Sequence, residues 1–316
     1  MELGISAADL RPRRTDAPQR AVTEHILALA DQAGYGAALI DAVADPADTS
    51  VITWPQFAHM VRAAAGGLSR RGLREADTAG IFVEDAVSHV VAVHAVRAAG
   101  AIAMPLRPAQ AAADVATQLK QGRARLLITS AGLAEIAIQA AERSWVRQVF
   151  AFGEAEGTTA FGSLLHTARH SQFQVYADAG QNGDASHGDN ARHGDNARHD
   201  GDVGRGDNAR HDGDVGRNGS SGGVQDLGWA GLGLPWPGLD GPGLTGRDVV
   251  VAAPLCGDPD VYTSLLDAAL AAGATIVAAP LAQVLEAVGI YKGTAAIVPR
   301  DTDVPGLPAE RVFTVD

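Results

Sequence analysis

A regular alternation of apolar segments with helical segments constrains the fold more than any other feature of this sequence. From residue 78, four short apolar segments fit buried strands, and a stretch with helical spacing of apolar residues follows each of the first three. Strands separated by helices form parallel βαβ units, whose sheets are covered by helices on both faces. The alternation resumes at residue 247 and continues to Asp316. The sequence therefore predicts an α/β fold, with a mostly parallel sheet flanked by helices.

The N-terminal part of the chain carries weaker signals. Residues 1–20 are polar, and we expect them to be flexible. Residues 21–33 fit a first helix. A turn rich in Ala, Asp and Pro then separates two short apolar segments, 37–41 and 50–53, which predicts a pair of strands.

The start of the next helix is well marked at Thr53. Its hydroxyl can accept a hydrogen bond from the first helical turn, and Gln56, three residues later, can reach back to the Thr53 N–H, as in a capping box. Apolar residues then recur at helical spacing up to Leu68, and Gly72 fits the position where helices end in left-handed backbone. The sequence predicts a helix between Thr53 and Gly72.

Residues 176–246 interrupt the alternation. They are rich in Gly, Asp, Asn, His and Pro, and the stretch 187–218 repeats HGDNAR and HDGDVGR units. The His and Asp residues suggest a metal site, but a calcium-binding roll needs regularly placed apolar residues, and the repeats offer only Val203 and Val215. A zinc site needs ligands in fixed geometry. Because the segment can bury little apolar surface, we expect a disordered low-complexity insert without a metal.

The insert divides the chain into an α/β region over residues 21–175 and a second α/β stretch over 247–316. The second stretch is too short to bury a core by itself, so we expect it to pack on the first. Removal of the insert should then leave the fold intact.

The formal net charge of −12 and the pI of about 5.2 limit the partners of the chain. Nucleic acid and anionic membrane surfaces repel an acidic protein, so neither is expected as a partner. No apolar run is long enough for a signal peptide or a membrane helix. The single cysteine, Cys256, excludes an intramolecular disulfide and fits a small core residue. These features predict a cytoplasmic protein, and abundant Ala, Gly, Arg and Asp with little Lys are typical of a high-GC bacterium.

Between residues 36 and 165 the motifs follow one order: a strand pair, a helix that begins near an aromatic residue, an apolar helix that ends in Ala-Gly, two prolines, and a strand with LLIT. The positions are Trp54, Phe57, Leu68, Gly72, Asp77, Gly100, Pro105, Pro108 and Leu126–Thr129. This series resembles the N-terminal region of the adenylate-forming acyl-CoA synthetases, also called AMP-binding enzymes. Residues 247–280 are similar to a later strand–helix–strand of that family. The resemblance implies the α/β fold of the family's N-terminal subdomains.

Several motifs that the resemblance implies are missing. The family's catalysis depends on a Ser/Thr/Gly-rich loop ending in Pro-Lys-Gly, whose N–H groups and Lys hold the ATP phosphates. The corresponding interval here is the insert, where only NGSSGG at 218–223 is similar. The family places a His after the next strand, where this sequence has Cys256 and Gly257. The adenine, ribose and hinge motifs and the C-terminal domain with its catalytic Lys are missing up to Asp316, so the chain resembles a truncated family member.

Few residues are candidates for a functional site. Thr129 and Ser130 lie at an expected strand end just before a helix, where anions bind readily and where open α/β sheets hold ligands. They equally fit helix caps, which is the interpretation we prefer, and Asp258 fits a cap as well. His89 and His94 lie on an expected apolar helix, and His94, in line with valines of that helix, fits a satisfied core or interface histidine. No catalytic or metal-ligating residue is assigned.

The missing motifs favour a non-catalytic relative of the acyl-CoA synthetases, a pseudoenzyme that serves as a scaffold or binds a small ligand. No cofactor is expected under this hypothesis, although binding of ATP, AMP or CoA stays open, and the partner is another protein or a second copy of the chain. Two alternatives remain. One is an acid–CoA ligase whose missing ATP site is supplied by a partner chain, and the other is a nucleotide-binding regulator.

Overall fold

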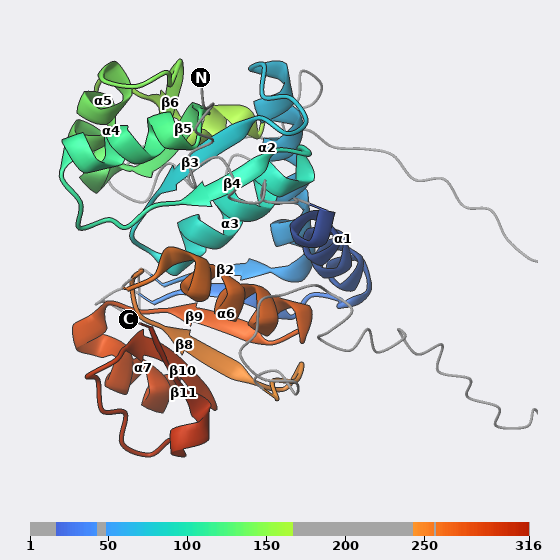
Figure 1. Ribbon diagram of the computed structural model, residues 1–316. Coiled ribbons are helices and arrows are strands. Elements are labelled where there is room, and N and C mark those ends of the chain that lie inside the picture. The colour runs from blue at the N-terminus through green and yellow to red at the C-terminus, as the bar shows by residue number, and fades with distance from the viewer. Residues whose placement is uncertain (1–16, 43–48, 167–242, 256, 316) are drawn as a thin grey trace, which may run out of the picture. The chain divides into compact units, whose positions relative to one another are not determined.

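The strands form two sheets in the computed structural model, which describes residues 17–42, 49–166, 243–255 and 257–315 (Figure 1). Sheet A has six strands in the order β11–β10–β8–β9–β1–β2, and sheet B has five in the order β4–β3–β5–β6–β7. Neighbouring strands pair in parallel, except that β1 and β2 are antiparallel. The mostly parallel α/β fold is therefore confirmed, with its strands divided between two sheets.

Most of the elements match segments expected from the sequence. Sheet A consists of β1 (Ala37–Asp41), β2 (Ser50–Thr53), β8 (Val249–Ala252), β9 (Thr275–Ala278), β10 (Ala295–Pro299) and β11 (Val312–Val315). Sheet B consists of β3 (Thr78–Phe82), β4 (Ile102–Pro105), β5 (Ala124–Ser130), β6 (Gln148–Phe152) and β7 (Thr159–Ala160). The α-helices of the described residues are α1 (Ala17–Gln32), α2 (Trp54–Arg70), α3 (Ala86–Ala98), α4 (Ala112–Gln121), α5 (Ala134–Glu142), α6 (Pro259–Ala271) and α7 (Val284–Ile290). Short 3₁₀ turns include η3 (Ala131–Leu133), η4 (Phe161–Leu164), η6 (Leu281–Gln283) and η7 (Ala309–Arg311).

Local sequence signals set the helix ends as expected. The capping box of α2 is confirmed, because the Gln56 N–H donates to Thr53 Oγ1 and the Thr53 N–H donates to Gln56 Oε1 at 2.8 Å. Gly72, with φ of +91°, follows the C-cap of the same helix and adopts the left-handed backbone that glycine tolerates. Asp258 caps α6 by accepting hydrogen bonds from two main-chain N–H groups.

Segments far apart in the sequence complete sheet A. Strand β1 pairs in parallel with β9, with Leu39 opposite Ile276, and the Thr275 hydroxyl donates to the Ala37 carbonyl at 2.8 Å. Residues 249–315 therefore share one sheet with the first strand pair. This pairing gives the short second stretch a core that it would lack by itself.

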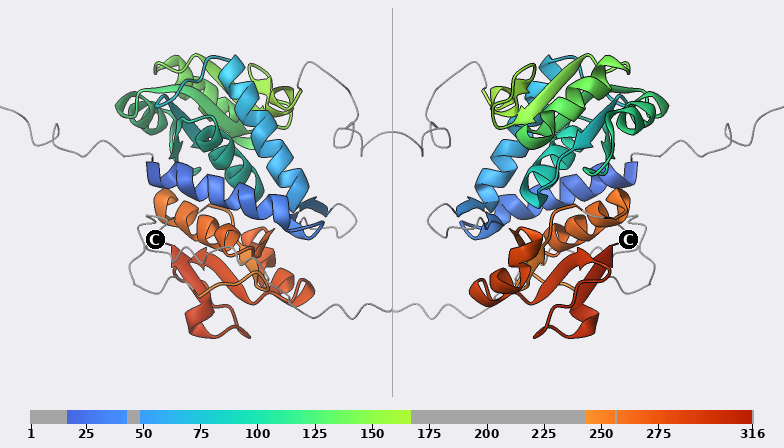
Figure 2. Two further views of the ribbon diagram at one scale, coloured as in Figure 1. Left: turned by 90° about the vertical axis from the view of Figure 1, so that its right-hand side faces the viewer. Right: turned by 90° about the vertical axis from the view of Figure 1, so that its left-hand side faces the viewer.

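Helices cover both faces of each sheet. The largest apolar cluster lies between the sheets and takes side chains from both sheets and from α1, α2, α3 and α6. Helix α1 packs on α2, α3 and α6, and Figure 2 shows α1 and α6 side by side. A second cluster places α7 on the outer face of sheet A, and a third places α4 and α5 on the outer face of sheet B. The fold thus buries each parallel sheet on both faces, as apolar strands require.

Two boundaries differ from the sequence-based expectation. Helix α1 begins at Ala17, so residues 17–20 are helical rather than flexible; Arg20 pairs with Glu24 at 2.9 Å and stabilises this first part of the helix. Residues 243–246, assigned to the insert, instead form the turn that leads into β8. The rest of the insert and Cys256 lie outside the described residues, and so does the repeat considered as a metal site.

Across the part of the chain that the structure describes, no helix is both long and apolar enough to cross a membrane.

Candidate functional site

Strand ends from the two sheets meet at one point. The Leu255 N–H, just after β8 of sheet A, donates to the Glu84 carbonyl, just after β3 of sheet B, at 2.8 Å. Both residues follow the carboxyl end of a parallel strand. Open α/β sheets bind their ligands at this edge. This junction is therefore the candidate functional site, and the side chains around it decide its chemistry.

The Glu84 carboxylate faces the end of β5. Ser130 donates its hydroxyl hydrogen to Glu84 Oε1 at 3.4 Å, and Ser130 is only 8 % exposed. A Cβ at Gly132 would lie 3.1 Å from the same carboxylate oxygen, so glycine leaves room for the carboxylate there. Thr129 is fully buried and donates to the Ser130 carbonyl at 3.4 Å. The two hydroxyls at this strand end are thus engaged with a carboxylate and with the main chain.

Two further carboxylates lie at neighbouring strand ends. Asp85 caps α3 and accepts a hydrogen bond from the Ser88 N–H at 2.6 Å. Burial raises the pKa of Asp41, at the end of β1, and the negative charge of Asp85 raises it further. Asp41 therefore binds a proton more readily than an ordinary aspartate.

The strand ends at the junction carry no positive charge within the described residues. Neither Lys nor Arg occurs in the described residues that directly follow β1, β3, β5 and β8. Arg107 follows the edge strand β4, and its side chain is exposed. Among the described residues, no group of three or more His, Cys, Asp or Glu side chains is arranged to hold a metal ion. The junction is an acidic site, and an acidic site repels phosphate groups.

The structure brings Thr129 and Ser130 together at this junction, where their role as an anion site stays a prediction. Ser130 occupies the N-cap position of η3 but makes no side-chain capping hydrogen bond, so the preferred interpretation as a cap is wrong for its hydroxyl, which turns to Glu84 instead. Sequence reasoning missed Glu84, Asp85 and Asp41 as site residues. For Glu84 and Asp85 the sequence did contain a signal, because Val-Glu-Asp follows an apolar strand just before a helix.

His89 and His94 lie in a buried polar cluster between α1, α3 and α6. The His89 ring bonds the Thr263 hydroxyl at 2.8 Å, and the His94 ring bonds the Thr23 hydroxyl at 2.9 Å. Both imidazoles are fully buried or nearly so, which confirms them as core residues. Burial lowers the pKa of His89 to about 3 and that of His94 to about 4, although the nearby Asp267 carboxylate acts in the opposite direction.

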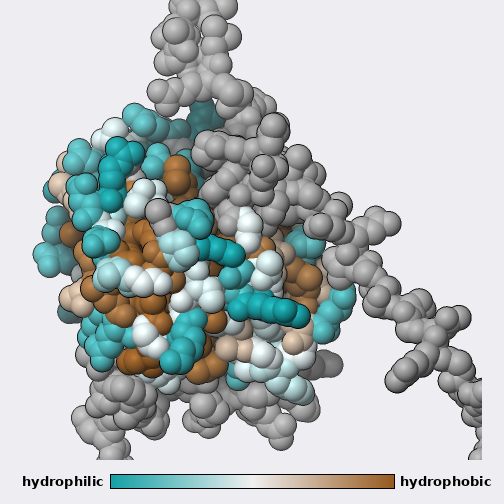
Figure 3. All heavy atoms as spheres, turned by 90° about the horizontal axis from the view of Figure 1, so that it is seen from below, coloured by the Kyte–Doolittle hydropathy of each residue, from teal (hydrophilic) through white to brown (hydrophobic). Residues whose placement is uncertain are grey.

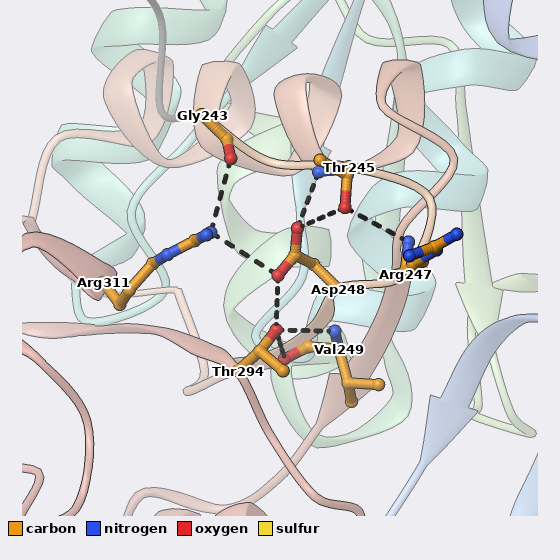
Figure 4. A network of polar contacts seen from close by, with 7 residues as sticks. All are labelled: Gly243, Thr245, Arg247, Asp248, Val249, Thr294 and Arg311. Atoms are coloured by element: carbon orange, nitrogen blue, oxygen red, sulfur yellow. Dashed lines mark hydrogen bonds and ion pairs between the residues drawn. The ribbon is translucent and has the colours of Figure 1, made fainter.

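A second polar cluster (Figure 4) fixes the amino end of β8, whereas the junction lies after its carboxyl end. Asp248 accepts hydrogen bonds from the Thr245 N–H at 2.6 Å, the Thr245 hydroxyl at 2.9 Å and the Thr294 hydroxyl at 2.7 Å. Arg311 Nη1 lies 3.4 Å from the same carboxylate and from the Gly243 carbonyl. Burial raises the pKa of Asp248, but the hydrogen bonds from Thr294 and Thr245 and the charge of Arg311 outweigh it, so the pKa lies below the ordinary value. This cluster anchors the turn at 243–247 to β10 and η7.

The sequence profile of the AMP-binding enzyme family matches residues 30–188, half of the chain. The chain belongs to the AMP-binding enzyme family. The matched range covers β1 to η4 and the strand ends of sheet B at the junction. No curated protein has a sequence that matches this AMP-binding family member.

Solved structures of two CoA ligases and of an amide bond synthetase share the fold. A long-chain-fatty-acid–CoA ligase from Archaeoglobus fulgidus superposes with a TM-score of 0.58 at 16 % identity, over 88 % of this chain and 51 % of its own. A benzoate CoA ligase from Burkholderia xenovorans gives 0.55 at 18 % identity, over 93 % and 54 %. An amide bond synthetase from Marinactinospora thermotolerans gives 0.55 at 14 % identity, over 89 % and 48 %. The AMP-binding family member described here thus spans about half the length of these structures.

Proposed function

We propose that this chain is a non-catalytic member of the AMP-binding family, which acts as a scaffold or binds a small ligand. The charge of the junction is the observation that carries the proposal. Glu84, Asp85 and Asp41 gather at carboxyl strand ends, the edge where open α/β sheets bind ligands. An adenylating enzyme must stabilise the negative charge of transferring phosphates. Carboxylates do the opposite, because they raise the energy of a phosphate anion placed beside them.

The sequence supports the same proposal. The family's phosphate loop ends in Pro-Lys-Gly, and no such tripeptide occurs in this sequence. A Lys at that place supplies a positive charge to the phosphates of ATP. Without that charge and with three carboxylates at the junction, formation of an acyl adenylate lacks its electrostatic support.

ATP–pyrophosphate exchange tests the proposal directly. The purified chain, incubated with Mg-ATP, labelled pyrophosphate and a panel of fatty and aromatic acids, should give no acid-dependent exchange above background. A benzoate CoA ligase assayed in parallel serves as the positive control. Acid-dependent exchange that co-purifies with the chain would contradict the proposal.

Calorimetric titration separates the two forms of the proposed role. Saturable binding of AMP, Mg-ATP or coenzyme A without exchange would assign a ligand-binding domain. If none of the three binds, the scaffold form is favoured. An acid–CoA ligase completed by a partner chain would instead show exchange only when that partner is added.

Exposed apolar side chains on the outer side of sheet A support the scaffold form. Leu281, Leu285 and Ile290 of η6 and α7 are 48 %, 50 % and 54 % exposed. Apolar patches lie among polar ones on the face of the molecule seen from below (Figure 3). Apolar surface of this kind is the usual basis of contacts between protein chains. A second copy of the chain or another protein is therefore the partner we propose, and sedimentation velocity with and without Leu281→Ser/Leu285→Ser checks the self-association.

A further inference from the structure

A hollow of about 260 Å³ lies at the amino ends of β5 and β6, and most of its wall is arginine. This edge of sheet B is opposite to the carboxyl ends that form the acidic junction. The lining residues, called here the arginine pocket, are Arg71, Gly72, Arg74, Arg125, Leu126, Arg147 and Gln148. Four arginines thus line one small hollow in a chain whose formal net charge is −12.

Two of the arginines are held side by side by main-chain pairing. The Arg147 N–H donates to the Arg125 carbonyl at 2.9 Å, and the next residues, Gln148 and Leu126, are opposite each other in the β5–β6 register. Neighbouring strands lie about 4.8 Å apart, so the side chains of Arg125 and Arg147 start next to each other. Like charges at adjacent positions of a sheet repel each other.

The other two arginines come from the connection between α2 and β3. Arg71 is the C-cap of α2, and its guanidinium carbon lies 6.0 Å from the centre of the Phe150 ring, within the range of a cation–π contact. The left-handed backbone at Gly72 then turns the chain, which brings Arg74 to the same hollow. A helix C-terminus favours a positive charge at Arg71, but it does not account for the three arginines outside the helix.

The positive charge of the arginine pocket is not balanced within the described residues. Asp77 is the carboxylate beside it, and this residue accepts from Arg125 Nη1 at 3.4 Å and from the Arg74 N–H at 2.9 Å. No described carboxylate lies within ion-pair distance of the guanidinium groups of Arg71, Arg74 or Arg147. Gln148 Oε1 is buried beside them without a hydrogen-bond partner in the described part of the chain.

We propose that the arginine pocket binds a phosphate-bearing anion, with a diphosphate group as the unit that fits it. Guanidinium groups match phosphate oxygens with paired, parallel N–H donors, which makes arginine the residue suited to this recognition. Pockets for drug-sized ligands measure roughly 300–1,000 Å³, so a hollow of about 260 Å³ fits a phosphate group better than a whole nucleotide. The pocket lies at the opposite strand ends from the junction, so this inference does not depend on the proposed function.

Calorimetric titration of the full chain with inorganic diphosphate at low ionic strength tests the proposal. We expect saturable binding with one site per chain, which sodium sulfate at the same ionic strength does not reproduce. A parallel titration with ADP identifies the source of the group. Tighter binding of ADP would assign the diphosphate of a nucleotide, and equal or weaker binding would assign the free anion.

Paired variants locate the binding site. Arg71→Gln/Arg147→Gln should weaken diphosphate binding about tenfold or more, because each lost charged hydrogen bond costs on that order. Arg107→Gln/Arg143→Gln removes the same charge at two exposed arginines outside the pocket, and this variant should bind within about twofold of the parent chain. Unchanged melting temperatures would show that both variants are folded. No saturable binding by the parent chain, or equal weakening in both variants, would overturn the proposal.

Discussion

Arg97 on α3 donates a hydrogen bond to Asp267 on α6 at 2.7 Å, and both side chains are almost completely buried. Helix α3 follows β3 of sheet B, whereas α6 connects β8 and β9 of sheet A. The ion pair therefore joins the helical layers of the two sheets. His94 Nε2 lies 3.4 Å from the other carboxylate oxygen, so Asp267 is the shared partner of two α3 side chains.

Removal of one partner from this pair should destabilise the fold strongly. We expect Asp267→Ala to lower the free energy of unfolding by about 3–5 kcal/mol, because it leaves the Arg97 charge buried without compensation. Urea unfolding followed by circular dichroism measures the change. The double variant Arg97→Met/Asp267→Leu, which replaces the pair by apolar groups of similar size, should recover most of the loss. If the loss of unfolding free energy in the double variant equals the sum of the losses in the two single variants, Arg97 and Asp267 are not coupled as described.

Acid should destabilise the protein through its two buried histidines. Their pKa values in the folded state, about 3 for His89 and about 4 for His94, lie below the ordinary value of 6.5. The unfolded chain therefore binds more protons, and the stability that the neutral rings contribute is present above pH 6.5 and is lost as the pH falls toward 4. Each such group contributes a slope of about 1.4 kcal/mol per pH unit.

The free energy of unfolding measured at several pH values between 7 and 4.5 checks this slope. His94→Gln removes one of the two titrating rings, so the slope should fall by the contribution of one group. This holds whatever the substitution does to stability at neutral pH. Equal slopes in the parent chain and the variant would contradict a role for the buried rings.

Two adjacent glycines of α2 should respond in opposite ways to alanine. A Cβ at Gly67 would overlap the Leu164 carbonyl oxygen, so Gly67→Ala should destabilise the protein by about 1–3 kcal/mol through overpacking. A Cβ at Gly66 meets only the end of the Arg70 side chain, at 3.3 Å, so Gly66→Ala should gain about 0.5–1 kcal/mol of helix stability. Thermal melting of the two variants side by side makes the comparison, and a similar change in both would rule out the close approach of η4 to α2.

The Asp248 cluster should be important for the return of the chain into sheet A. Asp248→Ala leaves the Thr245 and Thr294 hydroxyls and Arg311 without their acceptor, and we expect a loss of about 3 kcal/mol. Because the folded-state pKa of Asp248 lies below its ordinary value, this contribution is present at neutral pH and is lost as the pH falls through the folded pKa. Asp303→Ala, at an exposed aspartate, is the control and should change stability by less than about 0.5 kcal/mol. Equal losses in both variants, measured by urea unfolding at pH 7, would show that the hydrogen bonds of Asp248 add nothing.

Local signals in the sequence predict most of the described elements. Three local signals are confirmed: the capping box at Thr53, the left-handed backbone at Gly72 and the cap at Asp258. Each depends only on residues a few positions away in the sequence. The division into two sheets has no such signal. The parallel partner of β1, strand β9, lies more than two hundred residues away, and a pattern of apolar residues does not specify which distant strand pairs with which.

The candidate site was harder to predict than the fold. Thr129 and Ser130 were placed correctly at a strand end, but the Glu84 side chain that faces Ser130 comes from a different strand. The raised pKa of Asp41 depends on burial and on Asp85, and neither follows from sequence spacing. Likewise, Arg97 and Asp267 look like surface residues of two separate helices until the fold brings the helices together.

The pairing of β1 with β9 sets the order in which the chain can complete its fold during synthesis. Ala37 and Thr275, which it brings together, are 238 positions apart, and ribosomes add about 5–20 residues per second. The first strand pair therefore waits roughly ten to fifty seconds for its neighbour, while the closely spaced strands of sheet B can already pair. During that interval the edge of β1 and the face of α1 that later packs on α6 are open to other nascent chains. A chaperone that binds apolar segments would protect this protein best if it bound residues 17–41 and released them only after β9 had been made.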